Sequence, residues 1–381
     1  MATAPRSRGA TEIPFVDRLR SIRWGLFALL TLTAAIGVVM LYSAAGASFS
    51  PWAANHGYRY FLAASLLFFV ALVDIRIWQR FAYAGYVVGI LGLLTVQFFG
   101  SEGGGAQRWI DLGFMKLQPS EMMKIALIVA LARYFNGKTL EDMGKVSTLV
   151  VPVLLVLLPT ALIFEQPDLG TSVMLAAVGA IIFFCAGVRW WKVLLVATAG
   201  AAIVPLAWPF LATYQKNRIL TFLNPENDPL GTGYHIIQSK IAFGSGGLFG
   251  KGFTQGTQSQ LSFLPETQTD FIFALIAEEW GMLGALVILG LYIMIIFYCL
   301  WVSMRSRSQF GRLLAVGFNA NMFFYVFANM GMVTGLLPVV GVPLPLISWG
   351  GTVMIATMIS MGFVMNAYIF RKVVLGLHND G

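Results

Sequence analysis

Long apolar runs, separated by shorter polar connections, form the dominant pattern of this chain. Most of the runs approach the ~20 residues that an α-helix needs to cross a bilayer, and the second run is short enough to need the interfacial Tyr58 and Tyr60. The pattern predicts an all-α polytopic membrane protein with about ten transmembrane helices. The runs occupy residues 24–45, 60–73, 81–99, 119–134, 147–164, 169–188, 193–211, 270–301, 313–335 and 350–370.

Composition supports a single integral-membrane domain over residues 1–381. Hydrophobic residues make up 58% of the chain and charged residues only 11%. A soluble core could not cover so much apolar surface, and no polar block is long enough to form a separate soluble domain. The two cysteines lie within apolar runs, so they predict neither a disulfide framework nor a structural zinc site.

The distribution of basic residues predicts the topology. With the N-terminus inside, most of the 25 Lys and Arg fall on cytoplasmic loops, so both termini are expected in the cytoplasm. The net charge of +8 therefore indicates membrane orientation and not nucleic-acid binding. Residues 1–23 form a short cytoplasmic tail. The first run is too long for a signal-peptide core of about 7–15 residues, which favours an uncleaved first helix.

The polar segments on the other side predict a site that faces outward. These segments are residues 100–119, 165–169, 335–350 and the long extracytoplasmic loop 212–269 before helix eight. The Pro/Gly-rich segment 335–350 is too apolar for a solvated loop, so we expect it to be buried or re-entrant. Asn329, just before it, needs a hydrogen-bond partner inside the bundle.

Acidic residues cluster where the long loop meets the eighth run. Asp270 precedes the apolar helix, where a carboxylate could act as an N-cap. Glu278 and Glu279 lie two turns further in, where each charge would cost about 2.5–3.5 kcal/mol in lipid. Capping does not require these two residues. Their presence predicts a working site, together with Glu266 on the loop side.

Three further places in the chain offer charged candidates. Glu121 and Lys124 stand at i and i+3 after Pro119 and can pair on one helix face, either as part of a site or only to neutralise each other. Asp168 is either an N-cap or a supporting residue of the site. Arg108 and Trp109 together indicate an interfacial anchor or a contact to an anionic headgroup.

The long loop contains many glycines between residues 244 and 256. Glycine-rich backbone can approach phosphate oxygens closely, although neither a P-loop nor a dinucleotide fingerprint is present. A flexible linker is the alternative. Aromatic residues such as Phe222 and Tyr234 recur through the loop, which favours an ordered structure.

Taken together, these blocks resemble the SEDS family (shape, elongation, division and sporulation) over nearly the whole chain. Residues 256–266 are similar to the elongation member of the family, not to the division member. One departure is Trp349, where the family more often has Tyr. The matching residues are Arg108-Trp109, Gln118 to Glu121 with Lys124, Gln166 to Thr171, Gly233-Tyr234 with Gln238-Ser239, Leu264 to Glu266 with Thr269 to Phe273, Glu278-Glu279 with Gly281, and Gly341 to Pro345.

The resemblance implies a peptidoglycan glycosyltransferase that polymerises lipid II at the outer face of the bacterial inner membrane. Asp270 matches the essential acidic position and would act as general base, and Glu121 with Lys124 matches a functionally required pair. Arg108, Arg218, Lys240 and Lys251 are the candidates for diphosphate contacts. The other candidate substrate-binding residues are Trp109, Gln118, Ser120, Asp168, Tyr234, Gln238, Ser239, Glu266, Glu278 and Ser348.

The resemblance also implies partners. These are a class B penicillin-binding protein, which is a transpeptidase, and membrane proteins of the elongasome. The ligands would be lipid II, glycan linked to undecaprenyl diphosphate, and membrane lipids. A divalent cation, Mg²⁺ or Mn²⁺, could help the leaving group, but no spacing demonstrates one. Two rival functions remain open, a lipid II flippase and a non-enzymatic scaffold of the cell-wall synthesis complex.

Overall fold

A bundle of long helices makes up most of the protein. The computed structural model describes residues 13–103, 106–111, 113, 116–192, 194–195, 198, 213–227, 232–260, 263–264 and 266–375. In this part of the chain, seven helices are long and apolar enough to cross a membrane. They are α2 (Trp24–Ala44), α4 (Ile75–Phe99), α7 (Val146–Glu165), α8 (Leu169–Ala186), α13 (Ile272–Arg305), α14 (Gln309–Val333) and α15 (Gly351–Ile369).

Two further helices belong to the same bundle. These are α3 (Ala53–Leu72) and α5 (Pro119–Phe135), which pack against α15 and α4 respectively. Each of nine predicted apolar runs overlaps one described helix. The predicted run 193–211 lies largely outside the described residues. The structure is therefore that of a polytopic helical membrane protein, as the apolar pattern predicted.

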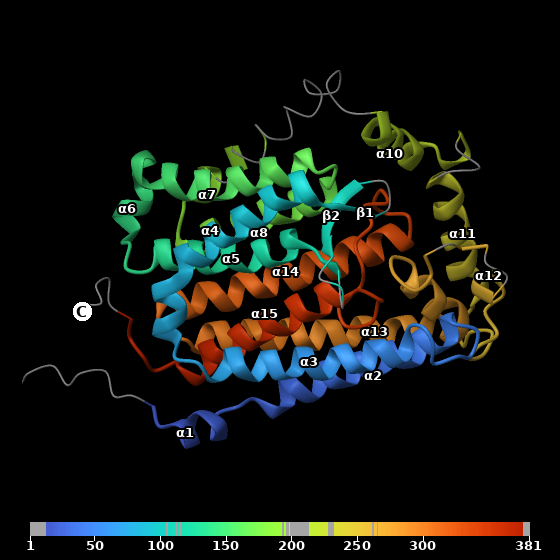
Figure 1. The fold of residues 1–381 in the computed structure, drawn as a ribbon, viewed down its shortest axis with the longest axis horizontal. Helices are drawn as coiled ribbons and strands as arrows, with labels where there is room; N and C mark the ends of the chain where they lie inside the picture. The colour runs from blue at the N-terminus through green and yellow to red at the C-terminus, as the bar shows by residue number, and fades with distance from the viewer. Residues whose placement is uncertain are drawn as a thin grey trace, which may run out of the picture.

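Helix α15 lies at the centre of the bundle, between α3, α13 and α14 (Figure 1). Nearly all of its residues are buried. Close packing against α3 depends on Gly362, because a Cβ there would lie 2.7 Å from the carbonyl oxygen of Leu67. Small residues at such crossings let helix backbones approach closely inside membranes.

The two ends of the bundle differ. One end carries the short helices α1 (Phe15–Arg20) and α6 (Leu140–Gly144) together with the C-terminal end of α15 (Figure 1). The opposite end carries α10 (Thr213–Leu223), the 3₁₀ turn η2 (Pro225–Asn227), α11 (Thr232–Ser245) and α12 (Thr257–Gln260). The long loop before α13 is thus largely helical where it is described; its recurring aromatic residues predicted an ordered loop but not these helices.

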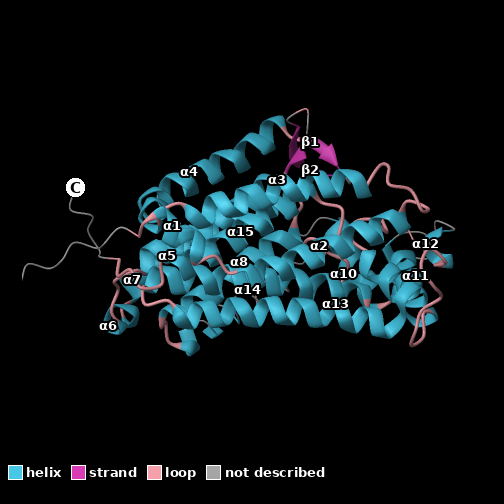
Figure 2. Cartoon of the chain, turned by 90° about the horizontal axis from the view of Figure 1, so that it is seen from below, coloured by secondary structure: helices cyan, strands magenta, loops and turns pink. Residues whose placement is uncertain are grey.

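A small antiparallel sheet was not predicted. Its strands are β1 (Ser101–Gly103), β2 (Ala106–Asp111) and β3 (Lys116–Leu117), and Figure 2 shows β1 and β2 beside the end of α4. In the sequence, only Gly104 and Gly105 separate β1 from β2, and a Gly-Gly pair is typical of a tight hairpin. The strands are too short to show an alternating pattern, so only this glycine signal could have revealed them.

Helix α13 is broken at Gly281, where the backbone has φ 69° and ψ −166°. The backbone of the glycine-rich segment, residues 244–256, packs against this break. The amide of Met282 donates to the Gly247 carbonyl at 2.9 Å, and the amide of Lys251 donates to the Glu278 carbonyl at 3.0 Å. These glycines therefore allow the backbone of the loop to approach the backbone of α13 closely. From the sequence, phosphate oxygens were considered as the group that approaches them.

Candidate functional site

A cleft of about 480 Å³ lies at the end of the bundle that carries α10 to α12. Side chains from β2, α5, α8, α14 and the turn before α13 line it. The sequence-predicted residues that it brings together are Arg108, Trp109, Gln118, Glu121, Asp168, Glu266 and Asp270. The residues that sequence reasoning did not select include Lys116, Thr171, Thr269, Tyr325 and Trp349.

Asp270 lies in the turn that precedes α13 and is partly buried. The helix begins at Ile272 and its N-cap residue is Phe271, so Asp270 lies one position before the cap. A Cβ added to Gly341 would lie 3.4 Å from Asp270 Oδ2, which places the carboxylate against the 335–350 segment. The position of Asp270 favours a role in the cleft over a role as helix cap.

Asn329 holds the backbone of Asp270. Its Nδ2 donates to the carbonyl oxygen of Asp270 at 2.8 Å and to that of Val342 at 2.7 Å. The side chain is fully buried on α14. The sequence predicted that Asn329 needs a partner, and the structure shows that one amide joins the Asp270 turn to the 335–350 segment.

The C-terminal part of the 335–350 segment fixes the same turn from another side. Ser348 Oγ donates to the carbonyl of Thr269 at 2.5 Å, and the amide of Trp349 donates to the carbonyl of Gln268 at 2.7 Å. Residues 344–348 are buried, as the apolar composition predicted. Ser348, a candidate substrate-binding residue, thus acts on the turn and does not line the cleft.

Glu121 and Lys124 form the predicted ion pair. Lys124 Nζ lies 2.7 Å from Glu121 Oε1, and the two side chains are only 2% and 4% exposed. The Tyr325 hydroxyl lies between them, donating to Glu121 and accepting from Lys124. Glu121 and Tyr325 line the cleft, and Lys124 lies behind them. Tyr325 sits in an apolar run and carries no sequence signal of this role.

Arg108 is anchored to the connection between α7 and α8. Its Nε donates to the Gln166 carbonyl at 3.2 Å, its NH2 donates to the Pro167 carbonyl, and its NH1 lies 3.9 Å from Asp168 Oδ1. These contacts place a cation at the wall of the cleft in a fixed orientation.

Asp168 is the N-cap of α8, and its side chain also lines the cleft. Its Oδ1 accepts from the amide of Thr171 at 3.2 Å, as the N-cap of α8. Its Oδ2 accepts from Gln118 Nε2 at 3.3 Å, at the cleft wall.

Glu278 and Lys251 pair with each other away from the cleft. Lys251 Nζ lies 2.7 Å from Glu278 Oε1, and the Glu278 side chain is fully buried. The same oxygen accepts from Thr257 Oγ1 at 3.1 Å and from the amide of Gln258 at 3.0 Å. Glu278 therefore fastens this part of the long loop to α13, and its carboxylate pairs with the charge of Lys251, the candidate diphosphate contact.

Glu279 also accepts from the loop, through the backbone amides of Thr254 and Gly256, and it reaches α2 as well. It accepts from Ser43 Oγ of α2 at 2.5 Å. The two acids that predicted a working site thus join α13 to the loop and to α2.

The remaining candidates whose side chains are described do not line the cleft. On α11, Ser239 Oγ donates to the Val333 carbonyl at 2.9 Å, and the Lys240 stem packs against Gly335. Tyr234 and Gln238 lie on the same helix, which contacts α13 and α14. Ser120 is buried on α5. Arg218 lies on α10, and its side chain is outside the described part of the structure.

A side compartment of about 480 Å³ opens beside the cleft. Trp109, Lys116 and Trp349 line both cavities. Arg59 of α3 lines the side compartment, with its guanidinium 4.1 Å from the centre of the Trp349 ring. A cation over an indole face is favourable, so Trp349 contributes an aromatic platform that needs no hydroxyl.

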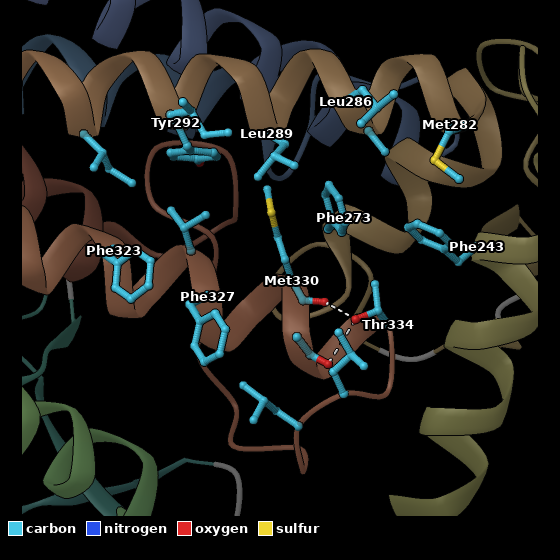
Figure 3. A pocket seen from close by; sticks show the side chains of 17 residues that line it. Phe243, Phe273, Met282, Leu286, Leu289, Tyr292, Phe323, Phe327, Met330 and Thr334 are labelled. Atoms are coloured by element: carbon cyan, nitrogen blue, oxygen red, sulfur yellow. Dashed lines mark hydrogen bonds between the residues drawn. The ribbon is translucent and has the colours of Figure 1, made fainter.

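An apolar groove of about 440 Å³ runs between α13 and α14 (Figure 3). Leu286, Leu289 and Phe327 line it. Two hydroxyls belong to its lining: Thr334 Oγ1 donates to the Met330 carbonyl at 2.8 Å, and the Tyr292 hydroxyl donates to the Pro345 carbonyl. Among the described residues, the groove therefore offers mainly apolar contact.

The described residues do not form a metal site of protein ligands alone. No group of three or more His, Cys, Asp or Glu among them is placed to hold an ion. Glu121 is engaged by Lys124 and Tyr325. Asp168 is engaged by Gln118 and a helix amide.

The chain is similar to known proteins over most of its length. Residues 23–373 match the FtsW/RodA/SpoVE family model, described as "Cell cycle protein". The chain is 46% identical over 316 residues to peptidoglycan glycosyltransferase MrdB of Escherichia coli (strain K12), covering 82% of this chain and 85% of that protein. It is 38% identical over 369 residues to a probable peptidoglycan glycosyltransferase FtsW of Trichlorobacter lovleyi, covering 91% and 93%.

Two solved structures are similar over most of the chain. One is described as "Structural coordination of polymerization and crosslinking by a peptidoglycan synthase complex", with TM-score 0.78 and 33% identity over 92% of this chain and 98% of that chain. The other is the crystal structure of the Thermus thermophilus rod shape determining protein RodA, with TM-score 0.68 and 28% identity over 92% and 97%.

Proposed function

The chain belongs to the FtsW/RodA/SpoVE family of cell cycle proteins, and on that premise we propose that it is a peptidoglycan glycosyltransferase that polymerises lipid II. The identity to MrdB exceeds that to the FtsW relative, which supports a role in cell elongation. The observation that carries the proposal is the carboxylate of Asp270 in a cleft that also holds Arg108 and Glu121.

Asp270 acts as the general base. The acceptor sugar hydroxyl is too weakly acidic to ionise at neutral pH, so a carboxylate must take its proton as the new bond forms. The hydroxyl oxygen attacks the anomeric carbon of the growing strand. The bond from that carbon to the lipid diphosphate breaks, and the diphosphate leaves with the electron pair.

Cations at the cleft wall stabilise the leaving diphosphate. Arg108 is held by the α7–α8 connection, so its guanidinium needs little reorganisation. Lys116 lies on β3, is exposed, and lines both the cleft and the side compartment. The two residues present positive charge from one small sheet. A divalent cation would have to be held mainly by the diphosphate itself, and no step here depends on one.

The Glu121–Lys124 pair positions one wall of the cleft. Lys124 has no access to the cleft, and through Tyr325 it fixes the direction of the Glu121 carboxylate. We assign Lys124 as a positioning residue and Glu121 as a cleft residue that contacts substrate.

The proposed location is the bacterial inner membrane, with the cleft facing the outer side. The apolar helices support a multi-pass membrane protein. The basic loops near α1 and α6 lie at the end away from the cleft, which supports an outward-facing site. One similar structure comes from a synthase complex that couples polymerisation and crosslinking, and we propose a transpeptidase of the class B penicillin-binding proteins as partner, within the elongasome.

Polymerisation of purified lipid II by the reconstituted protein with its partner tests the proposal. Asp270→Asn keeps the side-chain size, so we expect an unchanged melting temperature and a rate about 10²–10⁴-fold lower, the usual range for loss of a general base. Asp17→Asn, on an exposed helix at the opposite end, is the matched control and should retain full activity.

The same assay separates the rival functions. A flippase would move lipid II across vesicles but yield no polymer, and a scaffold would tolerate Asp270→Asn. An Asp270→Asn protein that polymerises at the wild-type rate would end the general-base assignment.

A further inference from the structure

A basic cavity of about 440 Å³ lies at the end of the bundle opposite the cleft. Three cationic side chains line it, Lys138 from the α5–α6 connection, Arg307 from the turn after α13, and Arg312 from α14. Gln309 and the end of α8, residues 185–187, complete the wall. No step proposed for the outer cleft uses these residues.

The charges in this cavity are not balanced by protein carboxylates. Among the described residues, no Asp or Glu lines the cavity, and none lies within ion-pair distance of its three cations. The nearby Asp142 of α6 lies 3.6 Å from Lys145, which is not part of the wall. Three like charges around one cavity repel one another, so an anion bound there would be stabilised.

The cavity lies at the level where the helices leave the membrane. Helix α5 ends at Phe135, α8 ends at Ala186, and α14 begins at Gln309. The ends of membrane-spanning helices lie at the depth of the lipid headgroups. A phosphate at this depth would belong to a lipid headgroup. The lipid would lie in the leaflet at the end of the bundle that carries α1 and the end of α15.

Exposed apolar side chains border the basic wall. Leu140 lines the cavity, and its side chain is 77% exposed. Next to the wall residues 185–187, the side chains of Phe184 and Trp190 are 56% and 65% exposed. Trp is enriched at membrane–water interfaces, and apolar surface next to a cation cluster fits acyl chains below a charged headgroup. A soluble anion would gain nothing from these residues.

We propose that this cavity binds the phosphate headgroup of an anionic phospholipid, with Lys138, Arg307 and Arg312 as the contacts. Basic pockets between membrane helices on the cytoplasmic side bind such headgroups. The site is separate from the glycosyltransferase cleft and does not depend on the function proposed for it.

Binding can be measured without any activity assay. The full-length protein is incorporated into nanodiscs of phosphatidylcholine with a minor fraction of spin-labelled phosphatidylglycerol, and the immobilised lipid fraction is quantified. For the double variant Arg307→Gln/Arg312→Gln we expect about 25-fold weaker retention of phosphatidylglycerol, from about 5-fold per cation. Arg305→Gln is the matched control, because Arg305 stacks on Trp301 at 5.1 Å and lies outside the cavity wall. It should retain the lipid as the wild-type protein does.

Two outcomes would overturn the proposal. One is equal retention in the wild-type protein and the double variant, since the cations would then serve only to orient the chain in the membrane. The other is displacement of the lipid by excess inorganic phosphate, which would mark a soluble-anion site. If the double variant does not fold, Lys138→Gln provides the same comparison, with melting temperature as the check on folding.

Discussion

Replacing Lys124 with Met tests how much the buried ion pair contributes to the fold. The substitution keeps the length and most of the volume of the side chain but removes its charge. Glu121 would then face Tyr325 as an uncompensated carboxylate in a region where both partners are almost fully buried. Glu121→Gln removes the other charge, and the double variant removes both.

The magnitude follows from the geometry. Two unit charges 2.7 Å apart attract by about 6 kcal/mol at an effective dielectric constant of ~20. Desolvation of both ions offsets much of this attraction, so the intact pair contributes little net stability. Removing one partner leaves the desolvation cost in place, and we expect each single variant to lose about 3–5 kcal/mol. The double variant should lose less than either single variant.

The assay is a double-mutant cycle on the free energy of unfolding, measured by denaturant titration in mixed micelles and followed by tryptophan fluorescence. A coupling energy near zero, with Lys124→Met as stable as the wild-type protein, would refute the argument. Lipid II polymerisation at a temperature where all variants are folded provides the second readout. We expect the double variant to recover stability but not activity, because the Glu121 carboxylate is absent from the cleft.

Two further predictions concern backbone positions. Asn329→Leu removes the two hydrogen bonds that fix the Asp270 turn. If Asp270 is the general base, as proposed, we expect kcat to fall about 10–100-fold with KM much less affected, as measured by initial rates of polymerisation. Unchanged kcat would show that the turn holds its position without this amide. Gly281→Ala places a Cβ against the amide nitrogen of Gly250 at a positive φ, so we expect a lower melting temperature and faster proteolysis of the glycine-rich segment. Gly290→Ala on the same helix meets no atom within 4 Å and should leave both unchanged.

The sequence predicted the helices well because membrane-spanning segments must satisfy their backbone hydrogen bonds internally and must be apolar over a fixed length. It also predicted the Glu121–Lys124 pair, since residues three apart on a helix are neighbours. Short strands and the break at Gly281 carry no comparable length signal. Their geometry depends on contacts with segments that are remote in the sequence.

The site itself was only partly predictable for the same reason. Buried glutamates such as Glu278 mark either a functional site or a structural ion pair, and the choice depends on Lys251, which is 27 residues away in the sequence. Tyr325 contacts Glu121 across 204 positions. Asn329 needed a partner, but only the fold identifies that partner as the backbone of Asp270 and Val342.

The anchoring of Asp270 also has a consequence for biosynthesis. The groups that fix its turn come from α14 and from the end of the 335–350 segment, and they leave the ribosome well after Asp270 itself. A nascent chain that has inserted all its earlier helices already carries Arg108, Glu121 and Asp270 but not the hydrogen bonds that align the turn. If Asp270 is the general base, as proposed, a translation product that stops before these segments would occupy the membrane without elongating glycan strands.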